Sequence, residues 1–131
     1  MKYLCLAYYN EKKFNSLPKT EFAAIVSQCK AHDDELYAGG HIDMVASLAA
    51  PALSKSIRPV GGHPLITDGP FAETKEQIGS FFIIEADSLE EAAAEATKHP
   101  AAHLGESVGW GVEIRPVEFF KEFSKGGNDA R

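Results

Sequence analysis

The sequence has little of what marks proteins that bind nucleic acid. Its 131 residues include 13 Lys and Arg against 19 Asp and Glu, which gives a formal net charge of −6, and no run of Lys or Arg forms a basic patch. Direct binding to nucleic acid depends on such cations, because they neutralise the phosphate backbone. We therefore expect no direct contact with nucleic acid.

Long apolar runs and cysteines are also scarce. Apolar stretches such as Phe81 to Ile84 have the length of a strand, far below the roughly 20 residues of a membrane span, and the N-terminus leads into a strand-like segment instead of a signal peptide. The two cysteines, Cys5 and Cys29, lie among apolar residues, which is typical of small buried side chains in a reducing compartment. These features predict a cytoplasmic protein without a membrane segment.

The length allows one hydrophobic core and is too short for two ordinary domains. Hydrophobic residues make up 44% of the chain and charged residues 24%, as in a globular domain. At the C-terminal end, Gly126, Gly127, Asn128 and Asp129 offer nothing to bury. We expect one domain over residues 1–123 and a flexible tail over 124–131.

Two segments have the pattern of central strands. In Tyr3 to Tyr9 and in Gly79 to Ala86, both alternating sets of side chains are apolar or aromatic, which indicates burial on both faces. Weaker strand patterns cover Met44 to Ala49, Ser56 to Val60, Pro64 to Thr67 and Gly111 to Val117, and Gly61-Gly62 predicts a turn.

Two segments have the pattern of helices. The first begins at Pro18 and ends at Gly39-Gly40, with an apolar stripe over Phe22, Ile25, Val26, Cys29 and Leu36. The second begins with the capping pair Ser88 and Glu91 and ends before Pro100. The order of these elements predicts an α+β fold of the ferredoxin-like, split βαβ type, with an antiparallel sheet and two main helices on one face.

Two helices cover only one face of such a sheet, yet the central strands are apolar on both faces. A soluble monomer rarely leaves a large apolar surface exposed. We therefore expect a homodimer in which a second copy stacks sheet on sheet. The alternative is that the segment from Met44 to Leu65 folds over the sheet of its own chain.

The run from Thr67 to Ser80, TDGPFAETKEQIGS, resembles the signature of the DGPF branch of the YCII-related family. The opening Met1 to Leu4, the turn at Val60-Gly61-Gly62, the strand Phe81 to Ala86, and the segments His99 to Ala102 and Val112 to Pro116 extend this resemblance over nearly the whole chain.

The resemblance implies a dimeric α+β barrel of ferredoxin-like subunits with a small-molecule cleft and without a cofactor. Some YCII relatives are similar in fold to muconolactone isomerase, and a His and Asp pair has been proposed as catalytic in part of the family. DGPF relatives also occur beside, or fused to, alternative sigma factors, which makes a sigma factor a partner by family analogy only.

Asp68 is the first catalytic candidate. It precedes Gly69-Pro70 in a turn, so its carboxylate either accepts backbone hydrogen bonds or, between apolar Ile66 and Phe71, is partly desolvated and transfers a proton. Lys75, in the charged stretch that follows, is either a solvated side chain or a site for an anionic ligand.

His32 is the second catalytic candidate, because together with Asp33 it extends the apolar stripe of the first helix towards a cleft. The alternative is a solvated helix end. The spacing to Gly40 does not match the family pattern, so the proposed family histidine is not carried over to His32. Arg58, Arg115 and Phe71 are candidates for substrate binding, although either arginine also suits a surface ion pair.

A metal site is not expected. His99 and His103 are four residues apart, but Pro100 breaks the helix that would bring them together. Two functions stay open at this level, beside a third interpretation as a purely structural homodimer. The first is a proton-transfer enzyme, of isomerase or lyase type, acting on a small organic acid. The second is a noncatalytic module that binds a ligand or a protein partner.

Overall fold

The structure, a computed structural model, describes residues 1–123, so the tail expected over 124–131 lies outside the described residues. The helices and strands follow in the order β1 (Lys2–Asn10), α1 (Glu11–Asn15), α2 (Lys19–Ala38), β2 (Ile42–Ser47), β3 (Lys55–Val60), β4 (His63–Asp68), β5 (Glu76–Glu85), α3 (Leu89–Ala96) and β6 (Gly111–Pro116). Short 3-10 turns cover Pro51–Leu53, Pro100–Ala102 and Glu106–Val108.

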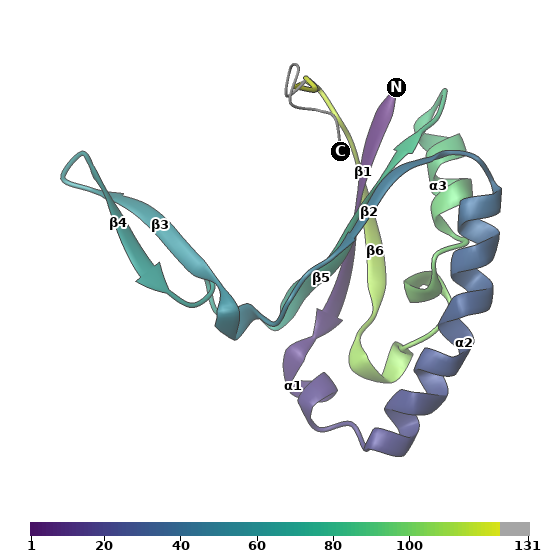
Figure 1. The fold of residues 1–131 in the computed structure, drawn as a ribbon, viewed down its shortest axis with the longest axis horizontal. Coiled ribbons are helices and arrows are strands. Elements are labelled where there is room, and N and C mark those ends of the chain that lie inside the picture. Colours follow the sequence, from purple (N-terminus) through teal and green to yellow (C-terminus); the bar gives the residue numbers. More distant parts are fainter. Residues whose placement is uncertain (124–131) are drawn as a thin grey trace, which may run out of the picture.

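The main sheet has four strands in the order β2-β5-β1-β6, and every neighbouring pair is antiparallel. Helices α2 and α3 lie on the same side of this sheet (Figure 1). This arrangement confirms the predicted ferredoxin-like α+β plan. The two strands expected to be central, β1 and β5, are the central pair.

The core lies between this sheet and the helices. Alternating side chains of β1 and β5, among them Cys5, Phe82 and Ile84, are buried and pack with Ala92 and Ala96 of α3. Small alanines on α3 let the helix lie close to the sheet. Within the described residues, no helix has the length and apolar character that crossing a membrane requires.

Helix α2 packs less closely than its apolar stripe predicts. Leu36 is its buried residue, whereas Phe22 and Val26 remain 37% and 47% exposed. The N-terminal part of α2 therefore stands off from the sheet, and a cavity occupies the space between them.

The opposite side of the sheet carries no helix (Figure 1). Cross-strand pairing places Leu4 beside Ile83, Leu6 beside Phe81 and Met44 beside Ile83 on this side. We call this surface, formed by Leu4, Leu6, Met44, Phe81 and Ile83, the open face. Met44 is 51% exposed.

Strands β3 and β4, at the two short segments predicted as strands, form a two-stranded hairpin. Its separation from the main sheet was not predicted. Gly61 and Gly62, with φ of +60° and +82°, make the expected turn between the two strands, since glycine adopts positive φ without strain. The hairpin extends away from the helices and from the sheet (Figure 1). The segment from Met44 to Leu65 therefore does not seal the open face of its own chain.

Candidate functional site

A cavity of about 480 Å³ lies between α2 and the helix-covered side of the sheet. Strands β1, β2 and β5 form its floor, and α2 lies above it. Its wall is mostly apolar and includes the aromatic rings of Tyr9, Phe14, Phe22, Tyr37, Phe82 and Trp110. A mostly apolar cavity with a few polar groups is the usual form of a small-molecule site.

Three of these rings form a continuous edge-to-face row at one end of the cavity. The centroids of Tyr9 and Phe14 lie 5.6 Å apart, and those of Phe14 and Phe22 lie 5.3 Å apart. Gly79 on β5 makes room for the first ring, because a Cβ at this position would lie 3.1 Å from Tyr9 Cδ1. The row closes this end of the cavity with apolar surface.

His99 lines the cavity from the segment that follows α3. Its Nδ1 accepts a hydrogen bond of 2.9 Å from the backbone N–H of Ala101. Burial lowers the pKa of His99 from 6.5 to about 4, so the imidazole is neutral at pH 7. Because Nδ1 accepts, the hydrogen-bond pattern assigns the ring proton to Nε2.

The Nε2–H group of His99 faces accessible space. It has no hydrogen-bond partner among the described residues, and none of their fully buried side-chain nitrogen or oxygen atoms lacks a partner. His99 Nε2 therefore keeps some accessible surface, and His99 is one of the residues that line the cavity. The group is a donor available to a ligand.

Asp33 reaches the cavity from α2, on the same helix face as Cys29 and Leu36. Burial, followed by the charge of Asp34, raises the pKa of the Asp33 carboxyl, and His32 acts in the opposite direction. Burial and the charge of Asp33 also raise the pKa of the Cys29 thiol. The cavity therefore combines a carboxylate of increased basicity with a neutral imidazole donor.

The structure places Asp68 away from this cavity, at the end of β4. Its side chain is 88% exposed and accepts a hydrogen bond of 2.6 Å from Lys55 Nζ. The Asp68 carboxylate therefore bonds to Lys55 and not to the backbone N–H groups expected for an Asx turn. In a single chain the Asp68 carboxylate is also not desolvated, contrary to the second expectation.

Arg58 and Phe71 do lie together. The Arg58 guanidinium stacks 3.7 Å from the Phe71 ring centroid and donates a hydrogen bond of 2.9 Å to the Phe71 carbonyl. Phe71 also lines a second, more open hollow of about 860 Å³ at the base of the hairpin. Lys75 is exposed in the loop between β4 and β5.

His32 and Arg115 also lie outside the cavity wall. The ring of His32 stacks on His103, with centroids 4.7 Å apart and planes at 13°. Arg115 is exposed on β6 and pairs across the sheet with Leu4, on the open-face side. Residues 1–123 hold no group of three His, Cys, Asp or Glu arranged as metal ligands.

Of the neighbouring pair His32 and Asp33, the sequence pointed to His32 as the catalytic candidate, whereas Asp33 is the residue that lines the cavity. The signal was present, because Asp33 is four residues after Cys29 and three before Leu36, which places it on the buried face. His99 was considered only as a metal ligand, and no sequence pattern places it on the cavity wall.

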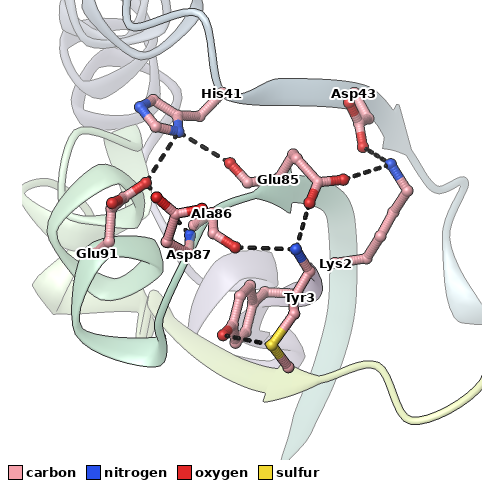
Figure 2. Close-up of polar contacts among 9 residues, drawn as sticks. Lys2, Tyr3, His41, Asp43, Glu85, Ala86, Asp87 and Glu91 are labelled. Atoms are coloured by element: carbon pink, nitrogen blue, oxygen red, sulfur yellow. Dashed lines mark hydrogen bonds and ion pairs between the residues drawn. The ribbon is translucent and has the colours of Figure 1, made fainter.

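A second polar cluster lies at the other end of β1 (Figure 2). Lys2 bonds to Asp43 on β2 and, at 2.9 Å, to Glu85 on β5. His41 Nδ1 lies 2.9 Å from the Glu85 carbonyl oxygen and 3.6 Å from Glu91 Oε1. These bonds join three strands to the start of α3, so the cluster has a structural role.

Comparisons with known proteins identify the family of this chain. The model of the YCII-related domain matches residues 1–121. Uncharacterized protein R00369 of Rhizobium meliloti (strain 1021) is 31% identical over 121 residues, which cover 92% of this chain and 95% of that protein. Among solved structures, 5-chloro-2-hydroxyhydroquinone dehydrochlorinase (TftG) from Burkholderia phenoliruptrix AC1100, in complex with 2,5-dihydroxybenzoquinone, is similar over 90% of this chain and 94% of its own, with a TM-score of 0.45 and 15% identity. The first two of these matches show that the chain belongs to the YCII-related family.

Proposed function

We propose that the cavity between α2 and the sheet binds a small neutral carbonyl compound, and that the protein transfers a proton on it as an isomerase or a lyase. One observation carries this proposal. Asp33, whose carboxyl pKa is raised, and His99, whose imidazole is held neutral, line the same largely apolar cavity. Titratable groups with shifted pKa values in one cavity are typical of acid–base sites.

The lining favours a neutral ligand over an organic acid. Among residues 1–123, Asp33 is the charged side chain on the cavity wall, and the wall includes no Lys or Arg. The cationic candidates Arg58, Lys75 and Arg115 lie elsewhere. A carboxylate ligand would meet Asp33 without a compensating cation, which a largely apolar cavity disfavours.

The two groups have complementary roles in this proposal. His99 Nε2–H donates a hydrogen bond to the carbonyl oxygen, and the Asp33 carboxylate takes a proton from the adjacent carbon. The electron pair of the broken C–H bond moves onto the oxygen, where the His99 donor stabilises the negative charge. Return of the proton to a different carbon completes an isomerisation, and loss of a leaving group from the next carbon completes an elimination.

Exchange of α-protons for deuterium tests the proposal without knowledge of the natural substrate. Cyclic ketones and lactones incubated with the protein in D₂O are followed by NMR. We expect exchange with the unmodified chain and at least tenfold slower exchange with Asp33→Asn. Glu35→Gln is the matched control, since Glu35 is an exposed carboxylate on the same helix that neither lines the cavity nor shifts the pKa of Asp33.

Equal exchange rates in Asp33→Asn and the unmodified chain would contradict the role of Asp33. If these compounds bind in the cavity but exchange no protons, the noncatalytic binding module becomes the better description of the protein. His99→Asn separates the second role, because the Asn side chain can still accept from the Ala101 N–H but lacks the Nε2 donor.

We also propose that the chain forms a homodimer through its open face and that it belongs to the DGPF branch. The apolar open face and the run from Thr67 to Ser80 support these two assignments respectively. Sheets that stack face to face bury such surfaces. Sedimentation should give twice the chain mass of 14.2 kDa, and a monomer at tens of micromolar would contradict the dimer.

A further inference from the structure

The β3–β4 hairpin has two different faces. Cross-strand pairing places Ile57 beside Ile66 and Pro59 beside Pro64, and these two pairs lie on one face because side chains alternate along a strand. We call Ile57, Pro59, Pro64 and Ile66 the arm face. Its isoleucines are 60% and 61% exposed in the single chain. At the base of the hairpin this face continues with the ion pair of Lys55 and Asp68. The opposite face carries Ser56 beside Thr67, Arg58 beside Leu65 and Val60 beside His63.

Each edge of the hairpin carries a proline close to the turn. Val60 and His63 flank the two-residue turn, so this pair forms the inward hydrogen bonds and the next pair, Pro59 and Pro64, points its backbone outward. Proline has no N–H to donate. Both outer edges therefore lack a donor at the same level, which is a known protection against edge-to-edge pairing. The prolines disfavour edge pairing near the turn, so contact through a face is the more favourable way to bind a partner there.

The arm face needs a partner for stability. A two-stranded hairpin alone is marginally stable in water and needs packing on one side. The hairpin extends away from the sheet of its own chain (Figure 1), and the exposure of Ile57 and Ile66 shows that no other part of residues 1–123 covers them.

A second copy of this chain fits both uncovered surfaces. The hairpin extends from the sheet on the side opposite the helices, which is also the side of the open face (Figure 1). Each chain carries an apolar arm and an apolar sheet face, and a twofold axis lets each chain supply what the other lacks. A stable interface buries roughly 800 Å² on each partner. Contacts made by the two arms would add to the area that the stacked sheets bury.

We propose that the β3–β4 hairpin is a dimerisation arm, whose arm face packs on the partner chain while the partner's arm packs in return. This inference rests on the proposed homodimer. It adds that the interface extends beyond the stacked sheets, and that residues of one hairpin face, and not the other, determine the strength of association.

Neighbouring positions on β4 provide a matched test. Ile66→Asp places a charge on the arm face, and Leu65→Asp places the same charge on the opposite face, where Leu65 is 50% exposed. Sedimentation equilibrium should give a dimer dissociation constant at least tenfold larger for Ile66→Asp and within about twofold of the unmodified value for Leu65→Asp. Far-UV circular dichroism checks that both variants remain folded.

A photo-crosslink locates the arm independently of any destabilising charge. A benzophenone amino acid in place of Ile66 is irradiated in a mixture of ¹⁴N- and ¹⁵N-labelled chains, and we expect crosslinked peptides that combine the two labels. Crosslinks confined to one label would overturn the arm, as would equal dissociation constants for the two Asp variants. A monomeric unmodified chain would instead remove the homodimer itself.

Discussion

The imidazole ring of His99 lies parallel to the ring of Phe82, with centroids 4.8 Å apart and planes inclined by only 1°. Phe82 is a buried core residue of β5, at 1% exposure, so it provides a fixed surface for this stack. The Ala101 N–H holds the ring on its Nδ1 side. Together these contacts fix the direction of the Nε2–H donor before a ligand binds, which reduces the reorganisation needed for catalysis.

The lowered pKa of His99 predicts how stability depends on pH. The unfolded chain takes up this proton near pH 6.5, whereas the folded chain takes it up near pH 4. Protonation therefore favours the unfolded state, and the free energy of unfolding should fall as pH drops from 6.5 to 4. The loss is at most about 3 kcal/mol, at 1.36 kcal/mol for each pKa unit, and is smaller because the ring is partly accessible.

His99→Asn isolates this contribution from the other acid-sensitive groups. Urea denaturation of both proteins at pH 4.5 and 7.5 should show a smaller loss of stability at low pH for the variant. An NMR titration of the unmodified protein gives the pKa directly. A His99 midpoint near 6.5 would show that the ring is not desolvated.

Sequence patterns predicted the main sheet because its central strands have a strong and local signature. The two-faced apolar pattern of Tyr3 to Tyr9 identified β1, and the capping pair of α3 is formed as expected, with Ser88 Oγ accepting a hydrogen bond of 3.1 Å from the Glu91 N–H. The separation of the β3–β4 hairpin from the main sheet was not predictable from such patterns. The pattern of a short strand does not specify which neighbouring strand it pairs with.

The site was harder to predict than the fold. Asp33 and His99 are far apart in sequence, and the cavity exists because α2 stands off from the sheet, which depends on tertiary packing. Helical periodicity shows which residues share a face, but it does not show how closely that face approaches the sheet. The signature from Thr67 to Ser80 identified the family and drew attention to Asp68, although the cavity lies elsewhere.

Leu36 should be the residue that attaches α2 to the core. It is 1% exposed, so Leu36→Ala removes buried apolar volume and should lower the free energy of unfolding by about 2–5 kcal/mol. Val26→Ala on the same helix should cost less than about 1 kcal/mol, since Val26 is 47% exposed. Urea denaturation of both variants measures the difference. Similar costs would mean that the N-terminal part of α2 packs more closely than described.

Trp110 and Gly105 provide a test of the opposite wall of the cavity. Gly105 has φ of +74°, and a Cβ at this position would lie 2.2 Å from Trp110 Cδ2. Gly105→Ala therefore combines two costs. Left-handed backbone costs about 1 kcal/mol for a residue with a Cβ, and displacement of the indole adds about 1–3 kcal/mol of overpacking.

Gly40→Ala separates these two costs. Gly40 has φ of +77°, but a Cβ there would meet no heavy atom within 4 Å, so its substitution carries the backbone cost alone. We expect Gly105→Ala to be the more destabilising change in urea denaturation. Trp110 is the single tryptophan of the chain, so its fluorescence should shift in Gly105→Ala and stay unchanged in Gly40→Ala. Because Trp110 lines the cavity, ligand binding should weaken in the first variant only, and equal binding in both would mean that the indole does not contact the ligand.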